Sequence, residues 1–142
     1  LSVKDELGGK ILVDVTAPLK PPKVGTVQLP QGGSCVVALQ AALGSQVKVV
    51  SAFQNVSAHH LPDASHDIDC DVLVCGDDRD ARETVIRLVE AAGLQGIHAG
   101  PLANSAAAEA LTSVLIFINR TYKVQGAGIR ITGLHQQVPH QG

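Results

Sequence analysis

The sequence predicts an α/β fold, in which helices cover a mostly parallel sheet. Three observations support this class. The apolar pattern follows the order strand, helix, strand, strand, helix, strand, helix. The strands are runs of β-branched residues, as in sheets that are buried on both faces. The core must be aliphatic, because Phe53, Phe117 and Tyr122 are the only aromatic residues. With 142 residues, 45% hydrophobic and 17% charged, the chain suits one globular domain.

The first predicted elements lead into a long loop. Residues 2–7 are typical of the last turn of a helix, which the next two glycines would cap. Residues 10–16 follow as a strand that ends before Pro18. The segment 20–33 is rich in proline and glycine and is therefore predicted to be a loop.

Ser34 is predicted to cap the next helix, which runs to Gly44, because a serine hydroxyl can accept a bond from a free N–H group of the first turn. Residues 47–53 and 71–75 are the next two strands, and a polar loop joins them.

Acidic residues mark the start of the following helix. Asp77, Asp78 and Asp80 complement the positive end of its dipole. Asp80 and Glu83 have the spacing of a capping box. The helix ends at Gly93, and residues 94–99 form a short strand.

The longest helix is predicted to begin with a cap at Asn104 or Ser105. Its buried stripe is predicted at Leu111, Val114, Leu115, Ile118 and Tyr122. Such an apolar helix packs in a core or against a second subunit, so we expect a homodimer with this helix at or near the interface. Residues 126–132 are a glycine break with a short extended end, and the polar residues 135–142 are predicted to be disordered.

Charge and hydropathy argue against two classes of partner. The net charge is −2 and the chain has no Lys/Arg stripe, so nucleic acid is not an expected partner. The longest strongly apolar run is the segment 114–118, which is too short to span a membrane. The sequence opens without an export leader, and its three cysteines have no metal-type spacing. These features predict a cytoplasmic protein.

A metal site is the first alternative for the chemistry. His59, His60 and His66 lie among four aspartates, which leaves a metal hydrolase as the least favoured hypothesis. Adjacent histidines on an extended chain point in opposite directions, so a solvated loop is favoured. Residues 67–72 resemble the opening of a calcium loop, but Val72 replaces the obligatory glycine. We predict no metal ligand.

Nucleophilic catalysis is the second alternative. Ser51, Ser57 and Cys75 are the candidates, but none lies in a G-x-S-x-G turn. Cys75 lies in an apolar strand and is predicted to be a packed core thiol. The sequence also contains no G-x-G-x-x-G and no P-loop. We predict no catalytic side chain.

Two strand ends remain as a candidate binding site. Ligands of open α/β sheets bind beyond the carboxyl ends of the strands. Residues 16–19 and 54–58 follow two such ends and carry neutral, hydrogen-bonding groups that would suit a flat organic ring. Ordinary polar loops would show the same pattern, so that alternative stays open.

Five segments resemble a known family. In chain order they are KILVDVTAPL, VKVVSAFQNVSAHHL, DVLVCGDDRDAR, GIHAGPLANSAAAEALTSVLIFINRTY and GAGIRI. They are similar to the C-terminal two thirds of the NADPH-dependent reductases of the deazaflavin coenzyme F420, over residues 1 to about 134.

The resemblance implies an oxidoreductase that transfers a hydride between NADPH and F420. It implies a Rossmann-like, mostly parallel sheet in residues 1–100, incomplete at its N-terminal half. A long helix and a closing turn, residues 101–134, would pack on the same core. No catalytic triad is needed, because the cofactors supply the reactive atoms.

The resemblance also implies the residues that hold the two rings. The cleft would be lined by Thr16, Ala17, Pro18, Leu19, Ala52, Phe53, Gln54, Asn55, Val56 and Ala58. The turn at Ala127 and Gly128 would close on the deazaflavin. Gln54 stands where some relatives carry histidine, which argues against a proton-transfer role there.

The sequence departs from the family pattern at the N-terminal end. The glycine-rich turn for the pyrophosphate and the Arg-containing loop for the 2′-phosphate of NADP are not found in it. We therefore expect a fragment that does not bind NADPH tightly and is inactive in isolation. The alternative is a non-catalytic Rossmann-like module for binding or assembly.

Overall fold

The structure is a computed structural model that describes residues 3–58 and 69–134. Its strands are β1 (Ile11–Asp14), β2 (Lys48–Ser51), β3 (Asp71–Gly76) and β4 (Gln95–His98). Its α-helices are α1 (Cys35–Leu43), α2 (Arg79–Ala91) and α3 (Ser105–Tyr122). Short 3-10 helices span Lys4–Glu6, where the sequence predicted the last turn of a helix, and Leu102–Asn104. The three histidines of the metal hypothesis and the predicted tail 135–142 lie outside the described residues.

The four strands form one mixed sheet in the order β1-β2-β3-β4. β1–β2 and β3–β4 are parallel, whereas β2–β3 is antiparallel. Each parallel pair is joined by a crossover that contains a helix, α1 in the first and α2 in the second. An antiparallel neighbour needs no crossover, and the described part of the β2–β3 connection contains no helix. The predicted α/β class with a mostly parallel sheet is confirmed.

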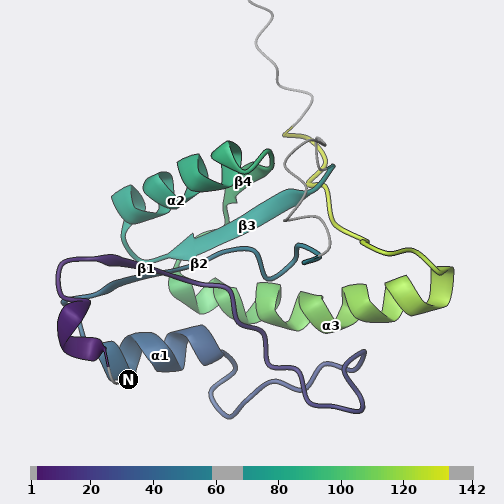
Figure 1. Ribbon diagram of the computed structural model, residues 1–142, viewed down its shortest axis with the longest axis horizontal. Helices are drawn as coiled ribbons and strands as arrows, with labels where there is room; N and C mark the ends of the chain where they lie inside the picture. Colours follow the sequence, from purple (N-terminus) through teal and green to yellow (C-terminus); the bar gives the residue numbers. More distant parts are fainter. Residues whose placement is uncertain (1–2, 59–68, 135–142) are drawn as a thin grey trace, which may run out of the picture.

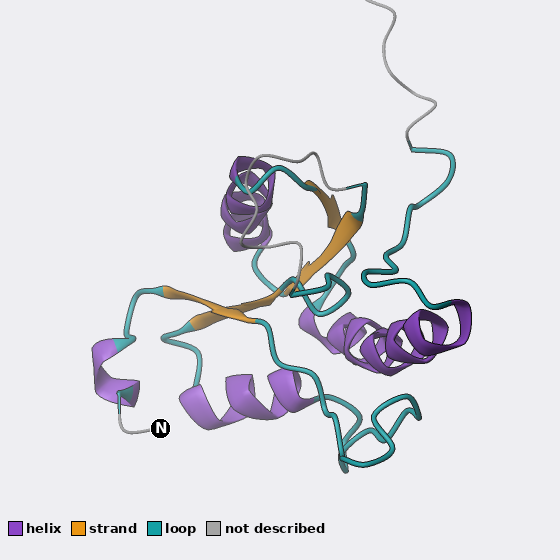
Figure 2. Cartoon of the chain, turned by 45° about the vertical axis from the view of Figure 1, so that its right-hand side comes forward, coloured by secondary structure: helices purple, strands orange, loops and turns teal. Residues whose placement is uncertain are grey.

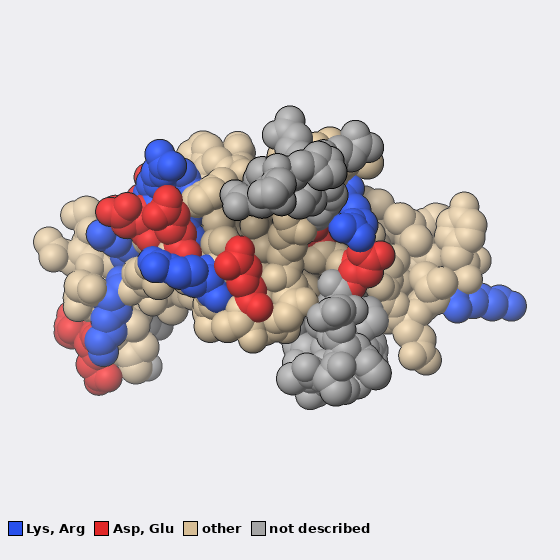
Figure 3. Space-filling model, turned by 90° about the horizontal axis from the view of Figure 1, so that it is seen from above, with Lys and Arg blue, Asp and Glu red and all other residues tan. Residues whose placement is uncertain are grey.

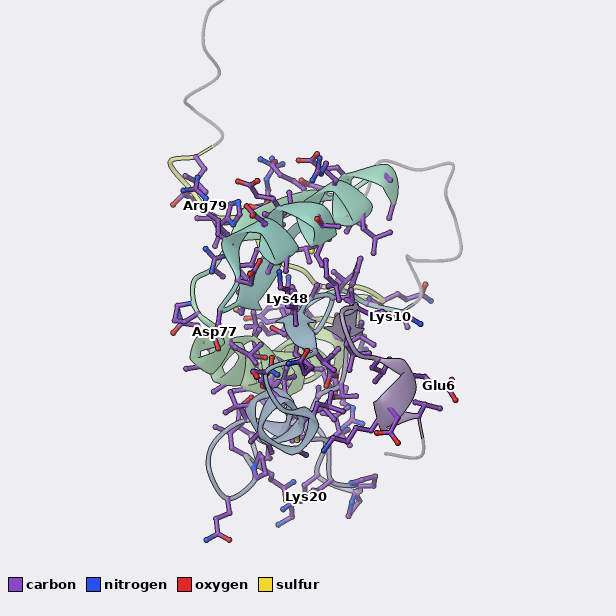
Figure 4. All side chains as sticks on the ribbon, turned by 90° about the vertical axis from the view of Figure 1, so that its left-hand side faces the viewer. Glu6, Lys10, Lys20, Lys48, Asp77 and Arg79 are labelled. Atoms are coloured by element: carbon purple, nitrogen blue, oxygen red, sulfur yellow. The ribbon has the colours of Figure 1, made fainter. Side chains whose placement is uncertain are left out.

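The sheet lies between two layers of helices. Figure 1 shows α2 on one side of the strands and α1 with α3 on the other, and Figures 2 and 4 show the same layers from two other directions. An aliphatic core fills each interface. One cluster, facing α2, is formed by Val50, Val72, Val74, Val85 and Val89, among others. The other, facing α1, is formed by Val36, Leu43, Val47, Val49 and Leu102.

Side chains at the N-termini of α1 and α2 satisfy free N–H groups. The Ser34 hydroxyl accepts a bond from the Val37 N–H at 3.1 Å, as predicted. The Asp78 carboxylate accepts one from the Ala81 N–H at 2.8 Å and caps α2. The predicted capping box of Asp80 and Glu83 is wrong, because Asp80 already lies inside the first helical turn.

The buried face of α3 differs from the predicted stripe. Leu115 is buried as predicted, but Val114 is 42% and Tyr122 73% exposed. The buried residues are mostly small or polar: Ser105, Ala108, Glu109, Ser113 and Leu115. Small side chains let the helix approach its neighbours closely, and Glu109 finds hydrogen-bond donors there, so this face is inward. The helix begins directly after Asn104, one of the two predicted cap residues, but the Asn104 side chain does not cap it, because its amide donates to the Ala99 carbonyl.

By length and composition alone, the helical segment Leu102–Tyr122 could cross a membrane, with a mean hydropathy of 1.3. One such helix is weak support for a membrane protein, because core helices pass the same test. Here the segment packs through Ser105 and Glu109 against the rest of the chain.

Charged residues of both signs lie near one another on the surface. In Figure 3, Lys and Arg alternate with Asp and Glu over the same part of the face. In Figure 4, Glu6, Lys20 and Arg79 point away from the core. The ion pair between Lys48 and Asp78 measures 3.2 Å and is solvent-exposed, so it contributes little to stability.

Candidate functional site

The parallel pairing of β1 and β2 brings the two predicted loops together. Asp14 and Ser51 are partners in this ladder, and each is the last residue of its strand. The loops that follow, residues 15–19 and 52–58, therefore leave the sheet at the same edge. Ala17 and Leu19 from the first loop and Gln54, Val56 and Ala58 from the second line one cavity.

This first cavity, which we call the β1 cavity, has a volume of about 490 Å³. Its lining is almost wholly apolar and consists of Val15, Ala17, Leu19, Phe53, Gln54, Val56, Ala58, Leu88, Ala92 and Thr112.

A second cavity of about 600 Å³, the α3 cavity, lies between the same loop, α3 and the segment after it. It is lined by Gln54, Asn55, Val56, Ser57, Ala58, Thr112, Leu115, Ile116, Asn119, Arg120, Val124, Gln125 and Ala127. Gln54, Val56, Ala58 and Thr112 line both cavities. Together with Thr112, the loop 53–58 is thus a wall common to two adjoining cavities.

The wall begins with a backbone conformation that side chains rarely adopt. Phe53 has a φ of 71°, in the left-handed region that disfavours residues with a Cβ atom. Gln54 follows, and its side-chain amide donates to the Asp14 carbonyl at 2.8 Å. The Val56 N–H donates to the Phe53 carbonyl at 3.2 Å and closes the turn. The surrounding structure thus compensates for the local strain.

Asn55 connects the wall to β3. Its side-chain amide donates to the Asp71 carbonyl at 2.6 Å, and its Oδ1 accepts from the Leu73 N–H at 3.2 Å. The side chain therefore satisfies backbone groups that a neighbouring strand would otherwise satisfy. It is only 1% exposed, so its amide serves the scaffold more than a ligand.

The remaining predicted residues have supporting positions. Thr16 donates from both its N–H and its hydroxyl to Asp14 Oδ1, at 2.8 and 2.7 Å, which shapes the end of β1. Ala52 is fully buried in the core. Like these two, Pro18 and Gly128 line neither cavity.

The predicted closing turn is held to the start of β3. Figure 1 shows the segment after α3 returning along the molecule to this end of the strand. The Ala127 N–H donates to Asn119 Oδ1 at 2.7 Å. The Asp71 N–H donates to the Ile129 carbonyl, and the Ile131 N–H donates to Asp71 Oδ2 at 2.6 Å. Ala127 lines the α3 cavity as part of this segment.

The described lining of the two cavities has one charged side chain, Arg120, and no carboxylate, histidine or cysteine. The described residues also contain no cluster of three His, Cys, Asp or Glu side chains that could hold a metal ion. Cys75 is 1% exposed, and burial raises the pKa of its thiol, which confirms the predicted core thiol. The site can bind and orient a ligand, but its own side chains offer no strong acid or base.

The sequence reasoning missed the contribution of α3. Thr112, Leu115, Ile116 and Asn119 line the α3 cavity and recur at helical spacing. The polar members, Thr112 and Asn119, are seven residues apart, which places them on one face of the helix, and this was the signal that could have revealed a polar face.

No protein-family model matches the chain. Three curated relatives are named F420-dependent NADP reductase. The relative from Methanocaldococcus jannaschii is 43% identical over 136 residues, which cover 93% of this chain and 60% of the relative. The relative from Methanothermobacter thermautotrophicus is 36% identical over 141 residues, which cover 96% of this chain and 61% of the relative.

A solved structure from Arthrobacter sp. FB24, provisionally assigned as an F420-dependent NADP reductase, matches with a TM-score of 0.76. The two sequences are 25% identical, and the matched region covers 92% of this chain and 60% of the Arthrobacter chain. The chain spans about 60% of the length of the curated relatives it matches. Over nearly its whole length, the chain is homologous to the F420-dependent NADP reductases, as the sequence motifs predicted.

Proposed function

We propose that the chain forms the ring-binding part of an NADP-dependent oxidoreductase that reduces or oxidises coenzyme F420. The overall reaction would be NADPH + F420 + H⁺ ⇌ NADP⁺ + F420H₂. The observation that carries the proposal is the wall 53–58, which has a cavity on each side, in a chain homologous to F420-dependent NADP reductases.

The composition of the two cavities suits this chemistry. When bound, the two cofactors would supply the reaction, because the hydride passes from one ring to the other. The protein must hold the rings at near-contact distance and exclude water. Aliphatic side chains such as Val56, Leu19 and Ile116 can exclude water, and the backbone of the wall can orient a planar ring.

Within this proposal, the ligand residues are cavity-lining members of the predicted set: Ala17, Leu19, Phe53, Gln54, Val56, Ala58 and Ala127. Thr16, Pro18, Ala52, Asn55 and Gly128 would hold the surrounding backbone in place without contacting the ligand. Arg120, at the α3 cavity, would add a positive charge for the phosphate groups that both cofactors carry.

Calorimetric titration of the 142-residue chain with F420 and with NADPH, followed by a spectroscopic assay with both, tests the proposal. We expect F420 to bind and NADPH to bind more weakly than micromolar, because the sequence contains no glycine-rich pyrophosphate turn. If neither cofactor binds at millimolar concentration, the proposal fails. If both bind and no hydride passes between them even when NADPH saturates the chain, the non-catalytic binding module is the better interpretation.

We also propose that the chain forms a cytoplasmic homodimer through the outer face of α3. Val114, Phe117 and Tyr122 are exposed there, and Phe117 is 59% exposed. An exposed apolar face on a long helix is typical of a subunit interface.

A further inference from the structure

Thr112 has an unusual hydrogen bond for a threonine inside a helix. Its hydroxyl donates to the Gln54 carbonyl at 2.7 Å, across 58 positions of sequence. Helical threonines commonly donate to the carbonyl four residues earlier. For Thr112 that acceptor is Ala108, at the longer distance of 3.4 Å. The shorter hydrogen bond of the hydroxyl is therefore the one to the wall, and the longer one is to its own helix.

Thr84 in α2 shows the ordinary arrangement. Its hydroxyl donates to the Asp80 carbonyl at 3.0 Å and is exposed. The two threonines therefore differ in their acceptor, and this difference makes Thr84 a matched control.

The Gln54 carbonyl, which accepts from Thr112, lies next to the strained residue of the wall. Gln54 is 4% exposed and follows the left-handed residue Phe53. Its side chain is held to the Asp14 carbonyl of β1, and its main chain is held to α3 by Thr112. Two different elements thus hold Gln54, and this clamp of Gln54 and Thr112 lines both the β1 cavity and the α3 cavity.

We propose that Thr112 is a positioning residue, whose hydroxyl holds the Gln54 carbonyl and thereby keeps the wall 53–58 in the shape that separates the two ring cavities. The effect of this hydrogen bond on cofactor binding rests on the proposed function. Without the hydroxyl, the turn at Phe53 loses one of the contacts that oppose its strain, and the peptide can rotate toward an ordinary conformation.

The first test does not involve a cofactor. Amide hydrogen exchange is measured by NMR at Val56, whose N–H closes the turn onto Phe53. We expect Thr112→Val to accelerate this exchange about tenfold, the size of one lost hydrogen bond. Thr112→Ser keeps the hydroxyl and should match the wild type, as should Thr84→Val. Wild-type exchange at Val56 in Thr112→Val would overturn the proposal.

The second test uses F420, whose binding is followed by its own fluorescence. We expect Thr112→Val to raise the Kd for F420 about tenfold and Thr112→Ser to restore it. An unchanged Kd despite faster exchange would overturn the link between the clamp and the ring site. If the wild type binds no F420 while the exchange pattern is as expected, the proposed function fails and the clamp itself stands.

Discussion

The hydroxyl of Ser34 donates to the carboxylate of Glu109 at 2.5 Å, although 75 positions separate the two residues. The same carboxylate accepts from the Cys35 N–H at 2.7 Å and from the Ser105 hydroxyl at 2.8 Å. Glu109 is fully buried, so one side chain of α3 satisfies the N-terminus of α1 as well as a serine at the start of its own helix. This contact orients α3, and α3 in turn supplies one side of the candidate site.

Glu109→Ala should therefore destabilise the fold strongly. The change leaves three donors without their acceptor in a buried place, and we expect a loss of about 3 kcal/mol or more in the free energy of unfolding. Urea denaturation measures it. Glu83→Ala, on the exposed face of α2, removes only the ion pair with Arg79 and should stay within about 0.5 kcal/mol of the wild type. Equal losses in the two variants would contradict this account.

Gly128→Ala should destabilise through contact with Cys70. A Cβ atom at position 128 would lie 2.8 Å from Cys70 Sγ, closer than atoms pack. We expect a cost of about 1–3 kcal/mol, and Cys70→Ala in the same chain should recover part of it in a double-mutant cycle. Gly25→Ala is the control, because its Cβ would meet Phe117 at an ordinary 3.6 Å. A cycle with no coupling between positions 70 and 128 would refute the steric explanation.

Arg120→Gln should weaken F420 binding if the proposed function holds. Loss of the single charge lining the α3 cavity should raise the Kd about three- to tenfold at low salt, since charge-assisted hydrogen bonds to phosphate are among the stronger ones. The difference should shrink as salt is added. Arg79→Gln, on an exposed turn of α2, should leave the Kd unchanged. A salt-independent effect would count against an electrostatic role.

Asp78 should make stability depend on pH in the acid range. The bond from the Ala81 N–H, and then Lys48, hold the pKa of its carboxyl below the ordinary value. A carboxyl with a lowered folded pKa contributes stability that is present above the unfolded pKa, near 3.9, and is lost as the pH falls through the folded pKa. Asp78→Asn keeps a capping side chain but no charge, so thermal melts should show a shallower fall of Tm below about pH 4. Parallel curves for variant and wild type would exclude this contribution.

Phe117→Glu should convert the proposed dimer to a monomer. A carboxylate on the outer face of α3 would be buried against a second copy, at a high desolvation cost. Light scattering at micromolar concentration measures the mass. Val3→Glu, which replaces an equally apolar and half-exposed residue outside α3, should remain dimeric. A monomeric mass for the wild type would refute the dimer directly.

Much of the fold could be predicted because its signals are local. Ser34 caps α1 because a hydroxyl three residues before a free N–H group is within reach. The strands of the core were recognisable as runs of valine, and Cys75 as a thiol within such a run. The choice of Asp80 as a cap failed because the sequence does not show which of the three aspartates has the extended backbone of an N-cap residue, and in the fold it is Asp78.

The candidate site was predictable in part for the same reason. The rule that ligands bind at strand ends selected the loops after β1 and β2, and the parallel pairing of Asp14 with Ser51 brings them together. The α3 side of the site was missed, because apolar periodicity indicated a different face of that helix.

By itself, the sequence determined the succession of strands and helices, the start of α1, the aliphatic core and the homology, since each depends on neighbouring residues or on ordered motifs. Tertiary structure alone decided which face of α3 is inward and that one loop separates two cavities. The reason is that both depend on hydrogen bonds between distant residues, Ser34 with Glu109 and Gln54 with Thr112. Local periodicity carries no information about such partners.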